Sequence, residues 1–68
     1  MAKYYVNNNV QANGDHEVHV AGCTFMPLEK NRTALGEFTN CADAVRAAKG
    51  YHTQVNGCKT CSKPCHTA

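Results

Sequence analysis

Four of the five cysteines of this chain fall into two groups, separated in the sequence, that have the spacing of metal ligands. Cys58 and Cys61 form a C-x2-C pair that is followed by Cys65 and His66, and Cys23 follows His19 in an H-x3-C arrangement. A C-x2-C turn directs two thiolates toward one centre, and a second pair from a distant segment completes a tetrahedron around zinc. The sequence therefore predicts a zinc site formed by His19, Cys23, Cys58 and Cys61.

The fourth ligand of this site has alternatives. His19 lies in a predicted strand, on the face opposite the valines, where a histidine commonly meets solvent. If His19 does not reach the metal, Cys65 is the natural fourth ligand and His66 is the third choice. We expect the two remaining histidines, His16 and His52, to be exposed to solvent.

The chain is too small to be stable without a cross-link. It has 68 residues, and Leu, Ile, Val and Phe together number ten, about 15% of the chain. A core of this size supplies only roughly 3–5 kcal/mol, so domains of this kind recruit a metal or disulfides. The formal charge is only +2 and the apolar residues are patterned, which indicates a folded domain, and we expect one domain over residues 1–68.

Metal is favoured over disulfides by the expected compartment. The sequence shows no apolar stretch typical of a signal peptide or of a membrane span, so we expect a cytoplasmic protein with reduced thiols and no membrane partner. Five cysteines, an odd number, also fit a disulfide framework poorly. The alternative is a secreted fragment stapled by two disulfides, with one thiol left over.

The first third of the chain predicts a β-hairpin. Residues 3–11 and 15–21 are separated by Ala12-Asn13-Gly14, and Asn-Gly is a strong hairpin signal. A three-residue loop pairs Val6 with Val20 and Val10 with His16, which collects the valines on one face. We therefore expect this register, with Gly14 in the left-handed conformation.

A short strand and one main helix are predicted in the middle of the chain. Residues 34–38 alternate as a strand, with Ala34, Gly36 and Phe38 on one face and Leu35 and Glu37 on the other. For the helix, Asn40 is a good N-cap and Gly50 a C-terminal stop. Apolar residues recur along it at helical spacing from Cys41, so we expect Cys41 in the core rather than at the metal. The fold class is thus α+β, closed by a C-terminal cysteine knuckle.

Residues 18 to 61 resemble the small Ada-type metal-binding module, the zinc domain of DNA alkylation repair methyltransferases. The resemblance is carried by Val18-His19-Val20-Ala21-Gly22-Cys23, Gly36-Glu37-Phe38, an alanine-rich helix, Gly50-Tyr51 and Gly57-Cys58-Lys59-Thr60-Cys61. It implies a zinc site in a standalone small module. In the family the closing cysteines directly follow Gly-Tyr, whereas six residues intervene here, and His19 replaces one thiolate of the four-cysteine site that accepts methyl groups. Methyl transfer is therefore not expected.

Charge is distributed unevenly along the chain. All five acidic residues precede residue 44, and the basic residues that follow are Arg46, Lys49, Lys59 and Lys63. A basic half of this kind can attract nucleic acid or an acidic protein surface. These four residues are the candidate contacts for weak nucleic-acid binding, and a protein partner is the other possibility.

No sequence motif indicates an enzyme. A zinc hydrolase needs an open coordination position and a nearby general base, and neither H-x-E nor H-E-x-x-H occurs. We expect a monomeric, non-enzymatic zinc-binding interaction module. The alternative function is metal handling or thiol redox sensing, in which the cysteines themselves are the function.

Overall fold

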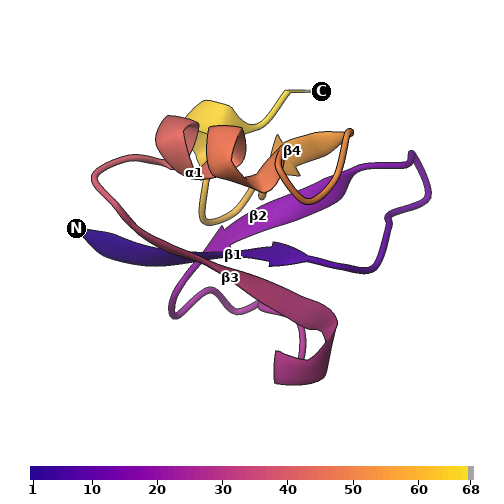
Figure 1. Ribbon diagram of the computed structural model, residues 1–68, viewed down its shortest axis with the longest axis horizontal. Helices are drawn as coiled ribbons and strands as arrows, with labels where there is room; N and C mark the ends of the chain where they lie inside the picture. Colours follow the sequence, from indigo (N-terminus) through magenta and orange to yellow (C-terminus); the bar gives the residue numbers. More distant parts are fainter. Residues whose placement is uncertain (68) are drawn as a thin grey trace.

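The protein is a small α+β domain in which one helix packs on a four-stranded sheet. The computed structural model describes residues 1–67. The strands are β1 (Ala2–Asn7), β2 (His16–Val20), β3 (Arg32–Phe38) and β4 (Val55–Gly57), and the helix is α1 (Cys41–Ala48). Two 3-10 turns, η1 (Glu29–Asn31) and η2 (Lys63–Cys65), complete the elements. Figure 1 shows α1 crossing one face of the sheet, and no helix among these residues has the length and hydropathy of a membrane span.

The sheet has the order β3-β1-β2-β4. The neighbours of β1 are antiparallel to it, whereas β4 pairs with β2 in parallel. The sequence did not predict β4, because three residues beginning with Val55 and ending with glycine carry no strand pattern of their own. Their pairing with β2 fixes them, and β4 leads directly into the cysteine knuckle at Cys58.

The predicted hairpin forms, but its register is shifted by two residues. Val6 pairs with Val18 and Tyr4 with Val20, and residues 8–15 form a longer loop in which Val10 is exposed. A slip of two residues leaves every side chain on its original face, so the valine pattern could not distinguish the two registers. Gly14 does adopt the predicted left-handed conformation, with φ of 91°.

The core lies between the sheet and α1. It consists of residues from the even-numbered face of β1 and β2 and from one stripe of the helix: Tyr4, Val6, Val18, Cys41, Ala44 and Ala48. The alanines are fully buried, because only a side chain this small lets the helix backbone approach the valines closely. The helix begins as predicted, since the Asn40 side chain accepts a hydrogen bond from the Asp43 N–H at 2.9 Å.

The third strand is longer than predicted and contains a bulge. Tyr4 pairs with Gly36 and Tyr5 with Ala34, so Leu35 is an extra residue opposite two consecutive residues of β1. Leu35 and Phe38 therefore both pack against the core, and the strict alternation predicted for this strand was wrong. Gly36 has φ of 109°, a value that suits the residue after the bulge only because it lacks a side chain.

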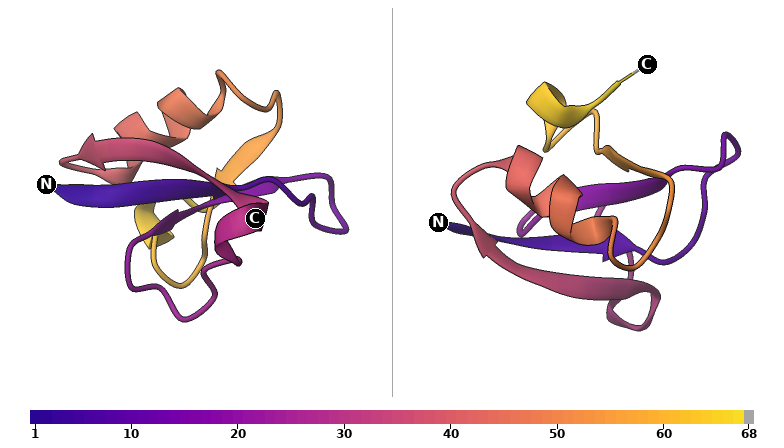
Figure 2. Two further views of the ribbon diagram at one scale, coloured as in Figure 1. Left: turned by 60° about the horizontal axis from the view of Figure 1, so that its bottom comes forward. Right: turned by 45° about the horizontal axis from the view of Figure 1, so that its top comes forward.

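Two connections cover the face of the sheet that lies away from the helix. Figure 2 (left) shows α1 above the sheet, with the β2–β3 connection and the start of the knuckle below it. Odd-numbered side chains of β2 point to this side, because Val18 and Val20 point to the helix. His19 is therefore buried, with 1% of its surface exposed, on the face that the sequence suggested would meet solvent.

Candidate metal centre

Strand β2 and the turn after it position the first two candidate ligands. His19 is held in the centre of the sheet by its pairing with Tyr5. The chain then turns, with the Cys23 N–H donating to the Val20 carbonyl at 3.1 Å and Gly22 adopting φ of 91°. A residue with a side chain is strained at this φ, so Gly22 permits the tight turn that returns Cys23 to His19.

The knuckle that carries the other two cysteines continues along the edge of β2. The Cys58 N–H donates to the Val18 carbonyl at 2.9 Å, which extends the β2–β4 ladder by one bond. The chain then turns back, because the Ser62 N–H bonds to the Cys58 carbonyl at 2.8 Å. The Val20 N–H donates to Sγ of Cys61 at 3.4 Å. Backbone bonds to β2 thus place both thiols beside the residues on either side of His19.

The fold brings His19, Cys23, Cys58 and Cys61 into one group, and their ligand atoms all lie within 4.8 Å of one another. Sγ of Cys23 is 4.0 Å from Sγ of Cys58, and Sγ of Cys61 is 3.8 Å from Nδ1 of His19. Two thiolates bound to a tetrahedral zinc at about 2.3 Å are separated by roughly 3.8 Å. The group can therefore hold a metal ion after its ligand atoms move closer by up to about 1 Å.

Burial keeps two of these groups neutral when no metal is bound. It lowers the pKa of His19, against the opposing influence of the Glu17 carboxylate. Burial also raises the pKa of Cys61 to about 12, and hydrogen bonding with Cys23 adds to this effect. A neutral imidazole is the form that binds metal, whereas the Cys61 thiol must lose its proton to do so. Metal binding at this group would therefore release protons.

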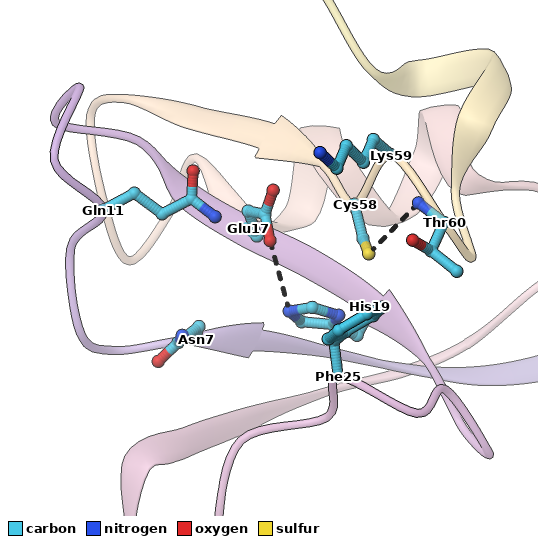
Figure 3. A pocket seen from close by; sticks show the side chains of 8 residues that line it. All are labelled: Asn7, Gln11, Glu17, His19, Phe25, Cys58, Lys59 and Thr60. Atoms are coloured by element: carbon cyan, nitrogen blue, oxygen red, sulfur yellow. Dashed lines mark hydrogen bonds and ion pairs between the residues drawn. The ribbon is translucent and has the colours of Figure 1, made fainter.

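A polar cleft opens beside the metal group on the same face of the sheet. It has a volume of about 290 Å³, and Figure 3 shows His19, Cys58 and Thr60 at one end with Glu17, Lys59 and Gln11 around it. Glu17 Oε1 lies 3.8 Å from Nε2 of His19, so Nδ1 is the nitrogen that faces the thiols. A carboxylate that accepts a hydrogen bond from the second ring nitrogen fixes the tautomer of a metal-binding histidine, and Glu17 would take this role if the distance shortened by about 1 Å.

The two alternative ligands lie outside this group. Cys65 is joined to Cys41 by a disulfide, which leaves it no thiolate for a metal. His66 is exposed, and its Nδ1 lies 3.0 Å from the Gly57 carbonyl oxygen. The expectation that Cys41 is a core residue is confirmed, but Cys41 is not a free thiol. The sequence analysis treated a metal and disulfides as alternatives, and this was wrong, because the described chain contains a disulfide as well as a possible metal site.

The histidines outside the metal group also differ from the prediction. His16 and His52 are half-buried and stack face to face, with ring centroids 3.7 Å apart and planes within 6°. His16 belongs to the helix-side face of β2, and His52 follows α1, so the two meet only through the tertiary fold. No pattern in the sequence links them.

The candidate nucleic-acid contacts do not form one patch of free charge. Arg46 pairs with Asp43 one turn earlier on α1. Lys59 lines the cleft beside the metal group (Figure 3). Lys49 and Lys63 are exposed, at the end of α1 and in η2 respectively.

Comparison with known proteins identified no relative: no family model, no curated protein and no solved structure matches the chain.

Proposed function

We propose that this protein is a small zinc-binding module in which the metal is structural and the folded surface serves as an interaction domain. The observation that carries the proposal is the convergence of one imidazole and three thiols to within 4.8 Å. A set of three sulfurs and one nitrogen is typical of zinc, which prefers such ligands over the oxygen donors chosen by calcium or magnesium. Four protein ligands fill the coordination shell, which favours a structural rather than a catalytic role.

The position of the group supports this role. A metal there would tie the turn after β2 to the knuckle, and these segments cover the sheet face that the small apolar core does not reach. The ligand order H-x3-C followed by C-x2-C also supports the resemblance to Ada-type modules, which we retain as the proposed family. The six residues that depart from the family pattern, 52–57, include β4.

Mass spectrometry of the purified protein tests the proposal. Under native conditions the mass should exceed the denatured mass by one zinc ion, and a chelator should remove the difference. The denatured chain should be two protons lighter than the fully reduced sequence, because Cys41 and Cys65 are joined. If the protein is purified with peroxide and other oxidants excluded and is still metal-free and four protons lighter, it contains a second disulfide in place of the metal, which would contradict the proposal.

Replacing one ligand distinguishes this site from adventitious binding. Cys61→Ser should lose the zinc, because a hydroxyl replaces the thiolate at the centre of the knuckle. Thr60→Ala is the matched control, since it alters the exposed neighbouring residue of the knuckle, whose contact with Cys58 is made by the backbone N–H and is preserved. Retention of stoichiometric zinc in Cys61→Ser would show that the assignment of this ligand is wrong.

A further inference from the structure

Cys23 and Cys58 place their sulfurs 4.0 Å apart although 35 residues separate them in the sequence. We propose that they form a dithiol that reacts with small hydroperoxides, and that its closure into a disulfide releases the metal. The proposal rests on the zinc-binding function and adds a regulation of that site by oxidation. It assigns a chemical role to these two cysteines in particular, apart from Cys61.

The cleft gives Cys58 a route to solvent. The residue as a whole is only 2% exposed, yet it lines the cleft of about 290 Å³ together with Lys59 and Thr60 (Figure 3). An oxidant that reaches Cys58 must therefore be small, which selects hydrogen peroxide or a short alkyl hydroperoxide over a bulky disulfide such as oxidised glutathione. The Thr60 N–H donates to Sγ of Cys58 at 3.4 Å, at the place where the knuckle borders the cleft. When zinc is bound, the Cys58 sulfur is held as a thiolate, which is the form that reacts with peroxide.

The reaction is a two-electron oxidation that balances with one peroxide. The Cys58 thiolate attacks one peroxide oxygen, the O–O bond breaks, and protonation of the leaving oxygen gives water and a Cys58 sulfenic acid. The Cys23 thiolate then attacks the Cys58 sulfur and displaces hydroxide, which solvent protonates to a second water. Two thiolates, one peroxide and two protons thus yield one disulfide and two waters. The metal loses two of its four ligands and dissociates.

The local structure favours Cys23 as the partner of Cys58. Sulfur atoms must approach from 4.0 Å to about 2.05 Å, which requires one of the two residues to move. Cys23 lies in the irregular connection after β2 and is partly exposed, so it can move without breaking a strand. Cys61 is held in place by the Val20 N–H, which donates to its sulfur.

The domain has a second cross-link that does not depend on the metal. The disulfide between Cys41 and Cys65 ties η2 to the start of α1, and the bond from Cys58 to Val18 keeps the knuckle on β2. The C-terminal segment therefore stays attached when the metal leaves. The oxidised protein therefore remains folded: peroxide converts a domain held by zinc and one disulfide into a domain held by two disulfides.

Tryptic mapping tests the proposal without any substitution. Cleavage after lysine and arginine separates Cys23 (peptide 4–30), Cys41 (33–46) and Cys58 (50–59), and leaves Cys61 and Cys65 together in 60–68, because Lys63 precedes proline. The zinc-loaded protein is treated with hydrogen peroxide, alkylated and digested without reductant. We expect peptide 4–30 linked to 50–59, peptide 33–46 linked to 60–68, and one zinc released per new disulfide to a chromogenic chelator.

Other products would overturn the proposal. A link between 50–59 and 60–68 would mean that Cys58 pairs with Cys61, and a link between 4–30 and 60–68 would mean that Cys23 pairs with Cys61. Retained zinc with no new link would mean that the dithiol does not react. If the protein carries no zinc at the start, the zinc-binding function fails, but the same digest still tests the dithiol: absence of the link between 4–30 and 50–59 contradicts it.

Two further arms test the order of the steps and the size of the oxidant. In Cys23→Ser, the sulfenic acid on Cys58 lacks its proposed partner and should be trapped by dimedone on peptide 50–59, whereas a link between 50–59 and 60–68 in this variant would show that Cys61 can replace Cys23. Oxidised glutathione at the same concentration should release at least tenfold less zinc than hydrogen peroxide from the unmodified protein. Equal release by both oxidants would show that the cleft does not control access.

Discussion

Oε1 of Glu17 lies 3.8 Å from Nε2 of His19, whose other ring nitrogen faces the sulfur of Cys61. A carboxylate behind a metal-binding histidine fixes the ring and raises its basicity, and its loss typically costs about 10–100-fold in metal affinity. We therefore predict a loss of this size for Glu17→Ala, measured by competition with a chelator of known affinity. Glu29→Ala removes an exposed carboxylate in η1 and should leave the affinity unchanged. Equal affinities of the two variants would contradict a role for Glu17.

The disulfide and the metal should contribute separately to stability. Cys41 and Cys65 are 24 residues apart in the sequence, and closing a loop of this length stabilises a domain by roughly 3–4 kcal/mol in the chain-entropy description. The double variant Cys41→Ala/Cys65→Ala should lower the free energy of unfolding by about this amount, measured by urea denaturation. It should still bind one zinc, because neither residue belongs to the metal group. Loss of zinc in this variant would show that the two cross-links are interdependent.

Gly57 should resist substitution because the chain after the knuckle packs directly against it. A Cβ at this position would lie 2.7 Å from Cβ of Cys65 and 2.8 Å from the Ser62 carbonyl oxygen. Gly57→Ala must therefore displace backbone, at a cost of about 1–3 kcal/mol, and should also weaken metal binding because Cys58 is the next residue. Gly50→Ala, where the nearest atom lies 3.3 Å away, is the milder control. Equal melting temperatures of the two variants would contradict the close approach.

The stacked pair of His16 and His52 should make stability depend on pH. Burial and the neighbouring His16 lower the pKa of His52 below its ordinary value of 6.5. The folded protein then binds fewer protons than the unfolded chain, so the contribution is complete above pH 6.5 and is lost as the pH falls below it. Metal loss adds its own pH dependence, so the informative quantity is the difference between the protein and His52→Gln. We expect the variant to show a shallower fall in unfolding free energy between pH 7.5 and 5.5.

Binding of nucleic acid, if it occurs, should be electrostatic and weak. Arg46 is paired with Asp43 and Lys59 lines the cleft beside the metal group, which leaves Lys49 and Lys63 as the exposed cations near the helix. So few phosphate contacts predict a shallow salt dependence and little sequence preference. Titration of labelled single- and double-stranded oligonucleotides at low and physiological salt measures this, with Lys49→Gln/Lys63→Gln as the variant. Absence of binding below about 100 μM at low salt would remove nucleic acid as a partner in favour of a protein.

Local signals in the sequence were sufficient for several features of this protein. Asn40 marks the start of the helix because its side chain caps the first turn, and the helix ends at Ala48, two residues before Gly50, although Gly50 does not adopt the positive φ of a glycine cap. The alternation of valines predicted that the valine side chains of β1 and β2 lie on one face of the sheet, because successive side chains of a strand point to opposite faces. The H-x3-C and C-x2-C spacings likewise paired His19 with Cys23 and Cys58 with Cys61, since each pair is closed by a local turn.

Only the tertiary structure decided the partners of these local units. The hairpin register was settled by burial of Val6 against Val18, because a shift of two residues is invisible to the face pattern. Cys65 joined Cys41 rather than the metal group because η2 packs against α1, a contact between segments with no shared sequence signal. His19 became buried because the knuckle and the β2–β3 connection cover its face of the sheet. Spacing along the chain determines which side chains a turn can bring together, whereas pairing between distant segments depends on packing, which involves the whole molecule at once.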